Sequence, residues 1–396
     1  MPLEITPVRT RSELKQFVQL PYRLHAGTQW IPQLKLERYA YLSRKLNPFF
    51  KHGDAELFLA RRDGRVVGRI SAQYDRNYNA FHDNRWGFFG FIEFEDDQEV
   101  VDALLSAAET WLRAYGRDRM VGPYDFVINE ECGVLIEGFE HEPMIRQPWH
   151  PPYYQQRLEN AGLQKAMDVF HWHLNMADRE TKLLPILEDL AVTSKEKHGI
   201  TVVKMSWWRL GRDLKEFAKI YSAAWSKNWG FQPYDKHDIA DLAVTYRLVF
   251  DKHWFMLAKN EKGEVVAAAI TIPDINQVYK KMKGRLLPLG WWHYLRRKKI
   301  IDRVRVGFLG VLPEYQHTGV AAQLYIENYN MCQFTPVRPG EPGWILETNT
   351  GMNRGVEAMG GHINKRMRIY ERLLEAGAEP AAPPEKVKRY SPKPAA

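Results

Sequence analysis

The feature that most constrains the fold of this chain is an internal repeat of long period. Residues 57–70 read LFLARRDGRVVGRI, and residues 255–270 read FMLAKNEKGEVVAAAI. Each stretch is an apolar run, a charged turn that ends in glycine, and a second run that begins with Val-Val. This is the pattern of a β-hairpin. The chain is therefore predicted to contain two copies of one hairpin-based unit.

A second pair of matching segments follows the hairpins at nearly the same separation. Residues 87–90 read GFFG and residues 307–310 read GFLG, and both are typical of short apolar strands. Each is followed by a helix-like stretch, at 99–115 and at 319–330. Because two matches recur in the same order, we expect a duplicated α+β domain.

The repeat divides the 396 residues into four parts. We place the first half at 1–170 and the second half at 199–375, with a partly helical connector at 171–198. The last residues, 376–396, are rich in Pro, Ala and Lys. Such a segment cannot bury a core, so a disordered tail is predicted there.

Composition excludes several classes of protein. The two cysteines, Cys132 and Cys332, form no spaced pair, which argues against a disulfide scaffold and a cysteine-based zinc site. The histidines form no i, i+4 pair with a partnering acid, so no metal site is expected. No apolar run is long enough for a transmembrane segment, and we expect a cytoplasmic protein. A net charge of +8 favours an anionic partner such as a nucleotide cofactor, nucleic acid or anionic lipid.

The most informative stretch is 304–321, VRVGFLGVLPEYQHTGVA. An apolar strand runs into a Pro-Glu-Tyr turn and then into a small-residue turn that begins a helix. Such a turn leaves backbone N–H groups unpaired at a helix N-terminus, where the helix dipole also favours an anion. Gly319 would allow close approach of a phosphate, and Ala321 would allow tight packing behind it. A pyrophosphate would fit such a turn.

Gln316-x-x-Gly319-x-Ala321 resembles the (Arg/Gln)-x-x-Gly-x-(Gly/Ala) signature of GNAT acetyltransferases, and 312–315 is similar to its usual lead-in. Downstream, 344–352 followed by 360–361 and 368–372 is similar to the fifth strand, helix and final strand of that family. The resemblance implies two tandem GNAT-like domains, each a mixed, mostly antiparallel sheet flanked by helices. The acyl-CoA signature lies only in the C-terminal half.

The resemblance also implies an acyl-CoA site, with acetyl-CoA or another acyl-CoA as co-substrate. Strand residues Leu309, Gly310 and Val311 would pair with the pantetheine arm, and Asn349 would bond that arm near the thioester. The coenzyme A pyrophosphate would be held by the backbone of Gln316, His317, Thr318, Gly319, Val320 and Ala321.

The first half lacks this turn. Its aligned segment, 96–101, reads DDQEVV, and Glu93 and Glu95 precede it. No glycine stands at the key position, and carboxylates occupy the place where phosphates would bind. Carboxylates are also ordinary stabilisers of a helix N-terminus. The first half is therefore expected not to bind coenzyme A and to serve as a scaffold and one wall of an acceptor cleft.

Catalytic residues are harder to place. Many relatives of this type carry a tyrosine seven positions after the strand-end asparagine and a glutamate base on the strand before the turn. Here the first position is Val356, and the strand 304–311 holds no carboxylate. Each remaining proton carrier also fits a structural role, and substrate positioning alone can accelerate a reaction. These remaining candidates are Glu347, Tyr325, Tyr370 and His317.

Residues 280–299 place an apolar, tryptophan-containing centre between basic clusters. This pattern fits a lid over an acyl chain, a membrane-surface contact, an RNA contact, or a plain exposed loop. Three further stretches, 122–133, 148–154 and 225–234, are dense in polar and aromatic residues, as ligand-contacting loops often are.

The sequence thus favours an acyl-CoA-dependent N-acyltransferase that acts on a small-molecule or protein amine. One alternative is a Fem-type aminoacyl-tRNA-dependent transferase, which fits the basic charge but lacks a working coenzyme A turn. Nucleic acid therefore stays open as the weaker partner. Another alternative is a non-catalytic acyl-CoA-binding protein, which fits the missing tyrosine and glutamate.

Overall fold

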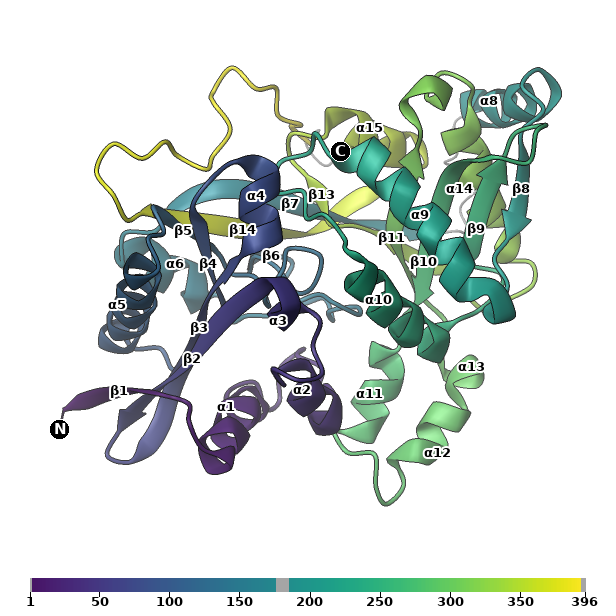
Figure 1. The fold of residues 1–396 in the computed structure, drawn as a ribbon. Helices are drawn as coiled ribbons and strands as arrows, with labels where there is room; N and C mark the ends of the chain where they lie inside the picture. The colour runs from purple at the N-terminus through teal and green to yellow at the C-terminus, as the bar shows by residue number, and fades with distance from the viewer. Residues whose placement is uncertain (1, 176–184, 393–396) are drawn as a thin grey trace. The chain divides into compact units, whose positions relative to one another are not determined.

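The computed structural model describes residues 2–175 and 185–392. The chain forms two compact units that are not contiguous in sequence (Figure 1). Unit 1 comprises Met1–Val169, Tyr279–Trp291 and Lys365–Lys388, and unit 2 comprises Phe170–Val278, Trp292–Asn364 and Arg389–Ala396.

Unit 1 is built on a mixed sheet with strand order β1-β2-β3-β4-β5-β14, in which β6 also pairs with β14. The strands of this sheet are β1 (Leu3–Pro7), β2 (Gly53–Arg62), β3 (Arg65–Asp75), β4 (Trp86–Phe94), β5 (Arg119–Gly122), β6 (Val134–Glu137) and β14 (His362–Leu373). The helices are α1 (Arg11–Leu24), α2 (Lys35–Tyr41), α3 (Phe49–His52), α4 (Arg76–His82), α5 (Gln98–Ala114) and α6 (Tyr153–Asn160).

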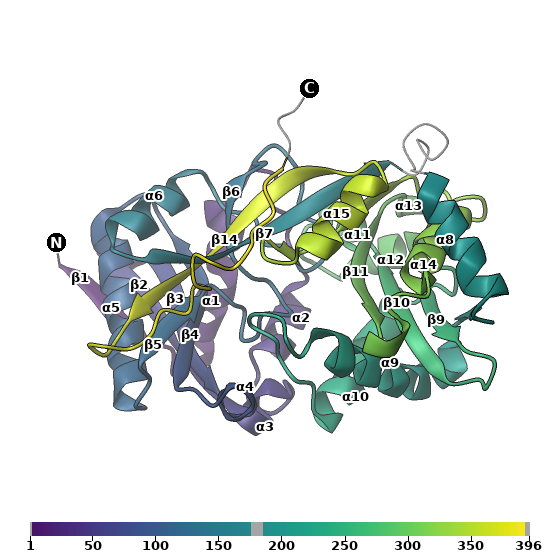
Figure 2. The same cartoon turned by 90° about the horizontal axis from the view of Figure 1, so that it is seen from above.

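The core of unit 1 lies between this sheet and α5. Phe89 and Phe94 of β4 pack with Leu104 and Leu105 of α5, and all four side chains are fully buried. The helix buries one face because its apolar residues recur at helical spacing, as in Val100, Val101, Leu104, Leu105, Ala108 and Leu112. Figure 2 shows α5 lying along the sheet of this unit.

Unit 2 repeats the arrangement with strand order β7-β12-β11-β10-β9-β8, in which β13 also pairs with β7. Its strands are β7 (Gln164–Asn175), β8 (Thr201–Lys204), β9 (Phe255–Lys259), β10 (Val265–Pro273), β11 (Val304–Val311), β12 (Pro339–Pro342) and β13 (Ile345–Leu346). Its helical segments are α8 (Pro185–Glu196), η2 (Trp207–Arg209), α9 (Leu210–Trp225), α10 (Lys236–Val249), η3 (Pro313–Tyr315), α14 (Val320–Met331) and α15 (Thr350–Ala358). Two short helices, α11 (Asn276–Met282) and α12 (Gly290–Leu295), cross the division between the units, and α13 (Arg297–Ile300) follows.

Both predicted hairpins are present. Arg62 of β2 pairs with Arg65 of β3 across a two-residue turn, in which Asp63 and Gly64 both have positive φ, as a tight hairpin turn requires. The second hairpin joins β9 to β10. The expected α+β fold, a mixed and mostly antiparallel sheet flanked by helices, is confirmed in each unit.

The two units share a further detail in the strand after the hairpin. The register of β4 against β3 shifts between Arg69 and Ser71, and that of β11 against β10 shifts between Ile270 and Thr271. Among residues 2–175 and 185–392, each strand then pairs in parallel with the next strand near its start, at Trp86–Phe88 in β4 and at Val304–Val306 in β11, and not over its second half.

Each of the two sheets includes a strand from the other half of the sequence. The strand β14 comes from the C-terminal half of the sequence, yet Tyr370 and Glu371 pair with β5 in the sheet of unit 1. Strand β7 comes from the N-terminal half, yet its last residues, Leu174 and Asn175, pair with β12 in unit 2. Each sheet therefore contains a strand contributed by the other half of the sequence.

Part of the C-terminal segment, for which the composition predicts a disordered tail, packs on unit 1. Ala381 is buried, and the backbone N–H groups of Ala381 and Ala382 donate to the Glu371 carboxylate at 2.6 and 3.0 Å. Glu371 is itself buried and needs such donors. The expected connector begins within β7 and ends in helix α8, while its residues 176–184 lie outside the described part of the chain.

Candidate functional site

The predicted phosphate turn forms the start of α14. Gly319 is the N-cap residue, with φ 81°, and among the described residues no side chain caps the first turn of this helix. The nearest hydroxyl, that of Thr318, instead donates to the carbonyl of Tyr315 at 2.7 Å. Because the first N–H groups of a helix have no partner within the helix, this uncapped start is suited to bind an anion.

Gly319 is required here for a reason that the sequence did not indicate. A Cβ atom at this position would lie 2.2 Å from the backbone carbonyl oxygen of Leu190 in α8. Helix α8 lies beside α14 in Figures 1 and 2, and Ser194 donates to Gln323 at 2.9 Å between them. The glycine therefore allows the close approach of two protein backbones.

The strand that would pair with a pantetheine arm has an available edge. Leu309, Gly310 and Val311 pair with β10 on one side. On the other side, the described residues pair β11 with β12 only at Val304–Val306. The edge beyond that point can therefore accept an extended ligand by β-type hydrogen bonding.

Asn349 lies at the N-terminus of α15. Its Oδ1 accepts a hydrogen bond from the backbone N–H of Met352 at 3.1 Å, so the side chain acts as a helix cap. Only the Nδ2 group of Asn349 is then left to donate to a ligand. Tyr325 of α14 reaches the same place, because its hydroxyl lies 3.2 Å from the sulfur of Met352. Burial raises the pKa of Tyr325 to about 12, so the phenol is protonated at neutral pH.

The other candidate proton carriers lie in different surroundings. Glu347 is buried in unit 2, with its Oε1 atom 3.5 Å from Nε of Arg389. Tyr370 belongs to unit 1, where its hydroxyl donates to Glu159 at 3.1 Å and burial raises its pKa. His317 is exposed in the turn itself. Tyr325 contacts the helix that carries Asn349, through Met352.

Unit 1 contains a polar cavity that the sequence analysis did not predict. Strand β4 contributes Phe91 and Glu93 to its wall, and the loops flanking β6 contribute much of the rest. The other lining residues include Trp30, Arg69, Asp125, Glu131, Trp149 and His150. The loops are within 122–133 and 148–154, the stretches noted for their density of polar and aromatic residues.

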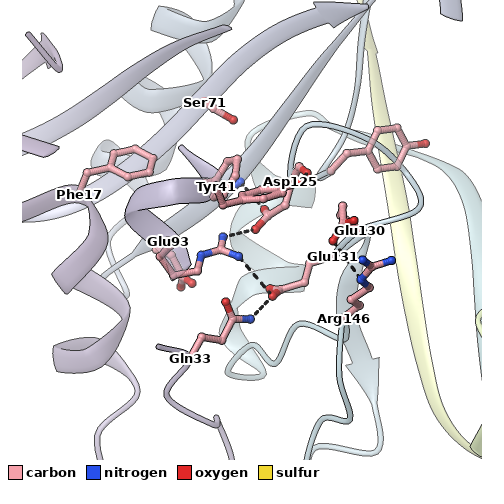
Figure 3. Close-up of polar contacts among 12 residues, drawn as sticks. Phe17, Gln33, Tyr41, Ser71, Glu93, Asp125, Glu130, Glu131 and Arg146 are labelled. Atoms are coloured by element: carbon pink, nitrogen blue, oxygen red, sulfur yellow. Dashed lines mark hydrogen bonds and ion pairs between the residues drawn. The ribbon is translucent and has the colours of Figure 1, made fainter. Parts of the chain in front are cut away.

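One side of the cavity is an acidic pair with a shared arginine, shown in Figure 3. Arg38 donates to Asp125 at 2.8 Å and lies 3.8 Å from Glu131, and Gln33 also donates to Glu131. Burial, reinforced by the charge of Asp125, raises the pKa of Glu131 to about 7. The positive charge of Arg38 therefore does not fully compensate the negative charges of Asp125 and Glu131.

The other side is centred on Glu93. One of its oxygens lies 2.6 Å from Nε2 of His25 and accepts from the hydroxyl of Tyr154 at 2.8 Å. Burial alone would raise the pKa of Glu93, but His25 and Arg69 together lower it to about 2. Burial lowers the pKa of His150, which lines the same cavity, to about 4.

This placement corrects the interpretation of the carboxylates in the first half. Asp97 does cap a helix, since its side chain accepts from Glu99 N–H at the start of α5. Glu93, in contrast, is not a helix-terminal residue: it lies in β4, is buried and faces the cavity. Side-chain alternation gives no signal for it, because eight consecutive residues of β4, from Gly87 to Phe94, are buried.

Comparison with known proteins gives relatives over nearly the whole length. No family model matches the chain. The bacterial ceramide synthase of Caulobacter vibrioides is 36% identical over 382 residues, which cover 94% of this chain and 98% of that protein. Protein YghO of Escherichia coli is 32% identical over 371 residues, which cover 92% of this chain and 94% of YghO.

Solved structures show the fold. A tandem GNAT protein from the clavulanic acid biosynthesis pathway matches with a TM-score of 0.57 at 12% identity, over 95% of this chain and 100% of that one. A GCN5-related N-acetyltransferase from Sphaerobacter thermophilus matches with a TM-score of 0.52 at 12% identity, over 96% and 98%. The chain thus has a tandem GNAT fold, and it belongs to the family that includes the bacterial ceramide synthase of Caulobacter vibrioides and YghO.

Proposed function

We propose that this chain is an acyl-CoA-dependent N-acyltransferase whose acceptor is a long-chain amino alcohol, so that its product is a ceramide-type amide. The observation that carries the proposal is the 36% identity to a bacterial ceramide synthase over nearly the full length of both proteins. A ceramide is the amide of such an amino alcohol, which means that its synthesis is an N-acylation. The tandem GNAT fold supports the same class of reaction.

Unit 2 supplies the features that an acyl-CoA needs. The uncapped start of α14 would bind the pyrophosphate through backbone N–H groups of Gln316–Ala321. The available edge of β11 at Leu309–Val311 would pair with the pantetheine arm. Asn349 would then donate to that arm through its Nδ2 group.

The reaction forms a C–N bond and breaks the C–S bond of the thioester. An amine that binds as an ammonium ion gives one proton to solvent before it attacks and loses a second as the amide forms, while coenzyme A leaves as a thiolate that takes up one proton. Tyr325 is our candidate for that proton donor, because burial keeps its hydroxyl protonated. Glu347 and Tyr370 are weaker candidates, because the first pairs with Arg389 and the second donates to Glu159.

The cavity of unit 1 suits the polar end of the acceptor. Asp125 and Glu131 provide carboxylate oxygens, and Trp30 and Trp149 provide aromatic surface, which together favour an ammonium group. A bound cation would also supply the positive charge that Glu131 lacks.

The decisive experiment measures release of free coenzyme A thiol and formation of amide. The purified chain is incubated with acyl-CoAs of several lengths and with either sphinganine, a short alkylamine or a lysine peptide. We expect amide formation with sphinganine. Tight acyl-CoA binding with no turnover on any acceptor would instead indicate a binding protein. Transfer from aminoacyl-tRNA alone would indicate the Fem-type alternative.

A further inference from the structure

The excess positive charge of the chain is concentrated in one segment, residues 280–299. This segment contains eight of the 56 lysines and arginines and no aspartate or glutamate. The rest of the chain has 48 basic and 48 acidic residues and is electrically balanced. The eight residues are Lys280, Lys281, Lys283, Arg285, Arg296, Arg297, Lys298 and Lys299.

Few of these charges are used within the fold. Lys280 pairs with Glu142, and Arg297 lies over the ring of Tyr294 at 4.6 Å. In the described part of the chain, the other six basic residues have no acidic partner, and all six are exposed. Their charge is therefore available to an external anion.

The apolar centre of the segment is also exposed. Leu287 and Leu289 are 71% and 70% exposed, and Leu295 is 60% exposed. Trp291 and Trp292 are exposed on α12 as well. Large apolar side chains gathered in one short stretch are unusual on a surface that meets only water.

The start of the segment is held on unit 1. Tyr279, just before it, donates to Glu37 at 2.8 Å, and the Gly284 carbonyl accepts from the backbone N–H of Lys35 at 3.3 Å. Within the segment, the indole N–H of Trp291 donates to the Pro288 carbonyl at 2.8 Å. The apolar side chains are thus presented by a folded element.

An apolar pocket of about 250 Å³ lies in unit 2 at the end of this segment. Arg297 and Lys298 form part of its wall, together with Phe250, Trp254, Ile301 and Phe334. Phe334 is itself 64% exposed. Arg297 and Lys298 outnumber the one acidic lining residue, Asp251, which contacts His253, so the pocket suits a molecule with an anionic head and a hydrocarbon chain.

We infer that residues 280–299 dock this protein onto the surface of an anionic lipid bilayer. Tryptophan and leucine side chains that enter the headgroup region, flanked by lysine and arginine, are the usual composition of such a contact. An RNA surface would use the basic residues but would leave Leu287 and Leu289 without a role. No helix in the described residues is both long and apolar enough to cross a bilayer. The inference rests on exposure and charge, and it does not depend on the proposed acyl transfer.

The test is sedimentation of the full chain with vesicles, without acyl-CoA or acceptor. One set of vesicles is phosphatidylcholine alone, and the other is phosphatidylcholine and phosphatidylglycerol in a three-to-one ratio. We expect binding to the second set that weakens with added salt. Lys281→Gln with Lys283→Gln should weaken it by about fivefold for each residue. Leu287→Ser with Leu289→Ser should weaken it by roughly tenfold or more.

Matched controls change exposed residues elsewhere. Lys45→Gln with Lys262→Gln removes the same charge, and Leu46→Ser with Ile186→Ser removes exposed apolar side chains outside the segment, so both should bind as the wild type does. Hydrogen exchange of the unmodified chain should show protection of 286–295 on vesicles, which avoids reliance on variants. Absence of vesicle binding, equal binding to uncharged vesicles, or binding only to single-stranded RNA would each overturn the inference.

Discussion

At the scale of single residues, the raised pKa of Glu131 leads to a prediction about how the stability of the protein depends on pH. Its carboxyl pKa is raised from 4.5 to about 7. An acid whose folded pKa exceeds its unfolded pKa holds its proton more tightly in the native state. The native state therefore loses stability as pH rises from about 4.5 through about 7. Glu131→Gln removes this loss, so its melting temperature relative to wild type should be higher at pH 8 than at pH 5.

The exposed Glu4 provides the control for this comparison, since Glu4→Gln removes a carboxylate at the surface and should not stabilise the chain selectively at pH 8. The same Glu131→Gln variant tests the acceptor site. Losing a charge-assisted hydrogen bond of about 1.5–3 kcal/mol should raise the KM for sphinganine roughly tenfold to a hundredfold. An unchanged KM and an unchanged pH response would show that Glu131 neither binds the acceptor nor carries the buried charge described above.

The proposed role of Tyr325 as proton donor leads to a second prediction at this scale. If its hydroxyl protonates the departing thiolate, Tyr325→Phe should lower kcat by roughly a hundredfold while leaving the affinity for acyl-CoA unchanged. Tyr329, on the same helix, donates to the carbonyl of Met359 at 2.8 Å and is the matched control. Tyr329→Phe should lower the melting temperature and leave kcat per folded molecule near the wild-type value. Equal kcat values for Tyr325→Phe and wild type would remove Tyr325 from the reaction.

At the scale of elements, the start of α14 is best tested at Ala321. Gly319→Glu is unsuitable, because any Cβ there would collide with the Leu190 carbonyl of α8. Ala321 is half-buried in the first turn, where a glutamate is compatible with the helix dipole. Ala321→Glu should keep its melting temperature and lose acyl-CoA binding, because it adds a carboxylate where phosphates would lie. Ala321→Gln has nearly the same size without the charge and should bind much more tightly than Ala321→Glu. Equal affinities in calorimetry would contradict a phosphate site.

The same element shows what sequence patterns can and cannot predict. Strand, turn and helix around Gly319 follow from local residue order, and so do both hairpins. The reason why residue 319 must be glycine does not follow from local residue order. It depends on the packing of α8, whose Leu190 is distant in sequence, against this turn. The exchange of β7 and β14 and the cavity around Glu93 and His25 are likewise set by long-range packing. A single sequence carries no local signal for such pairings.

At the scale of the whole molecule, the duplicated fold has diverged in its two copies. In unit 1 the edge of β4 is occupied within the chain, because the Tyr124 N–H donates to the Phe89 carbonyl at 2.7 Å. A Cβ atom at Gly90 would lie 1.6 Å from the Tyr124 carbonyl oxygen. The start of α5 is capped by Asp97, which also pairs with Arg62. Both features that unit 2 offers to a coenzyme are therefore already used in unit 1.

This divergence predicts one coenzyme A site per chain. Titration of acetyl-CoA and of a longer acyl-CoA into the full-length protein by calorimetry should give a stoichiometry of one. The site should belong to unit 2, so Ala321→Glu should abolish it. Asp97→Asn removes the charge at the start of α5 but keeps a capping side chain, so it should leave the stoichiometry at one. Two equivalent sites in the wild type, or residual binding at full affinity in Ala321→Glu, would mean that unit 1 also binds the coenzyme, despite its occupied strand edge and capped helix.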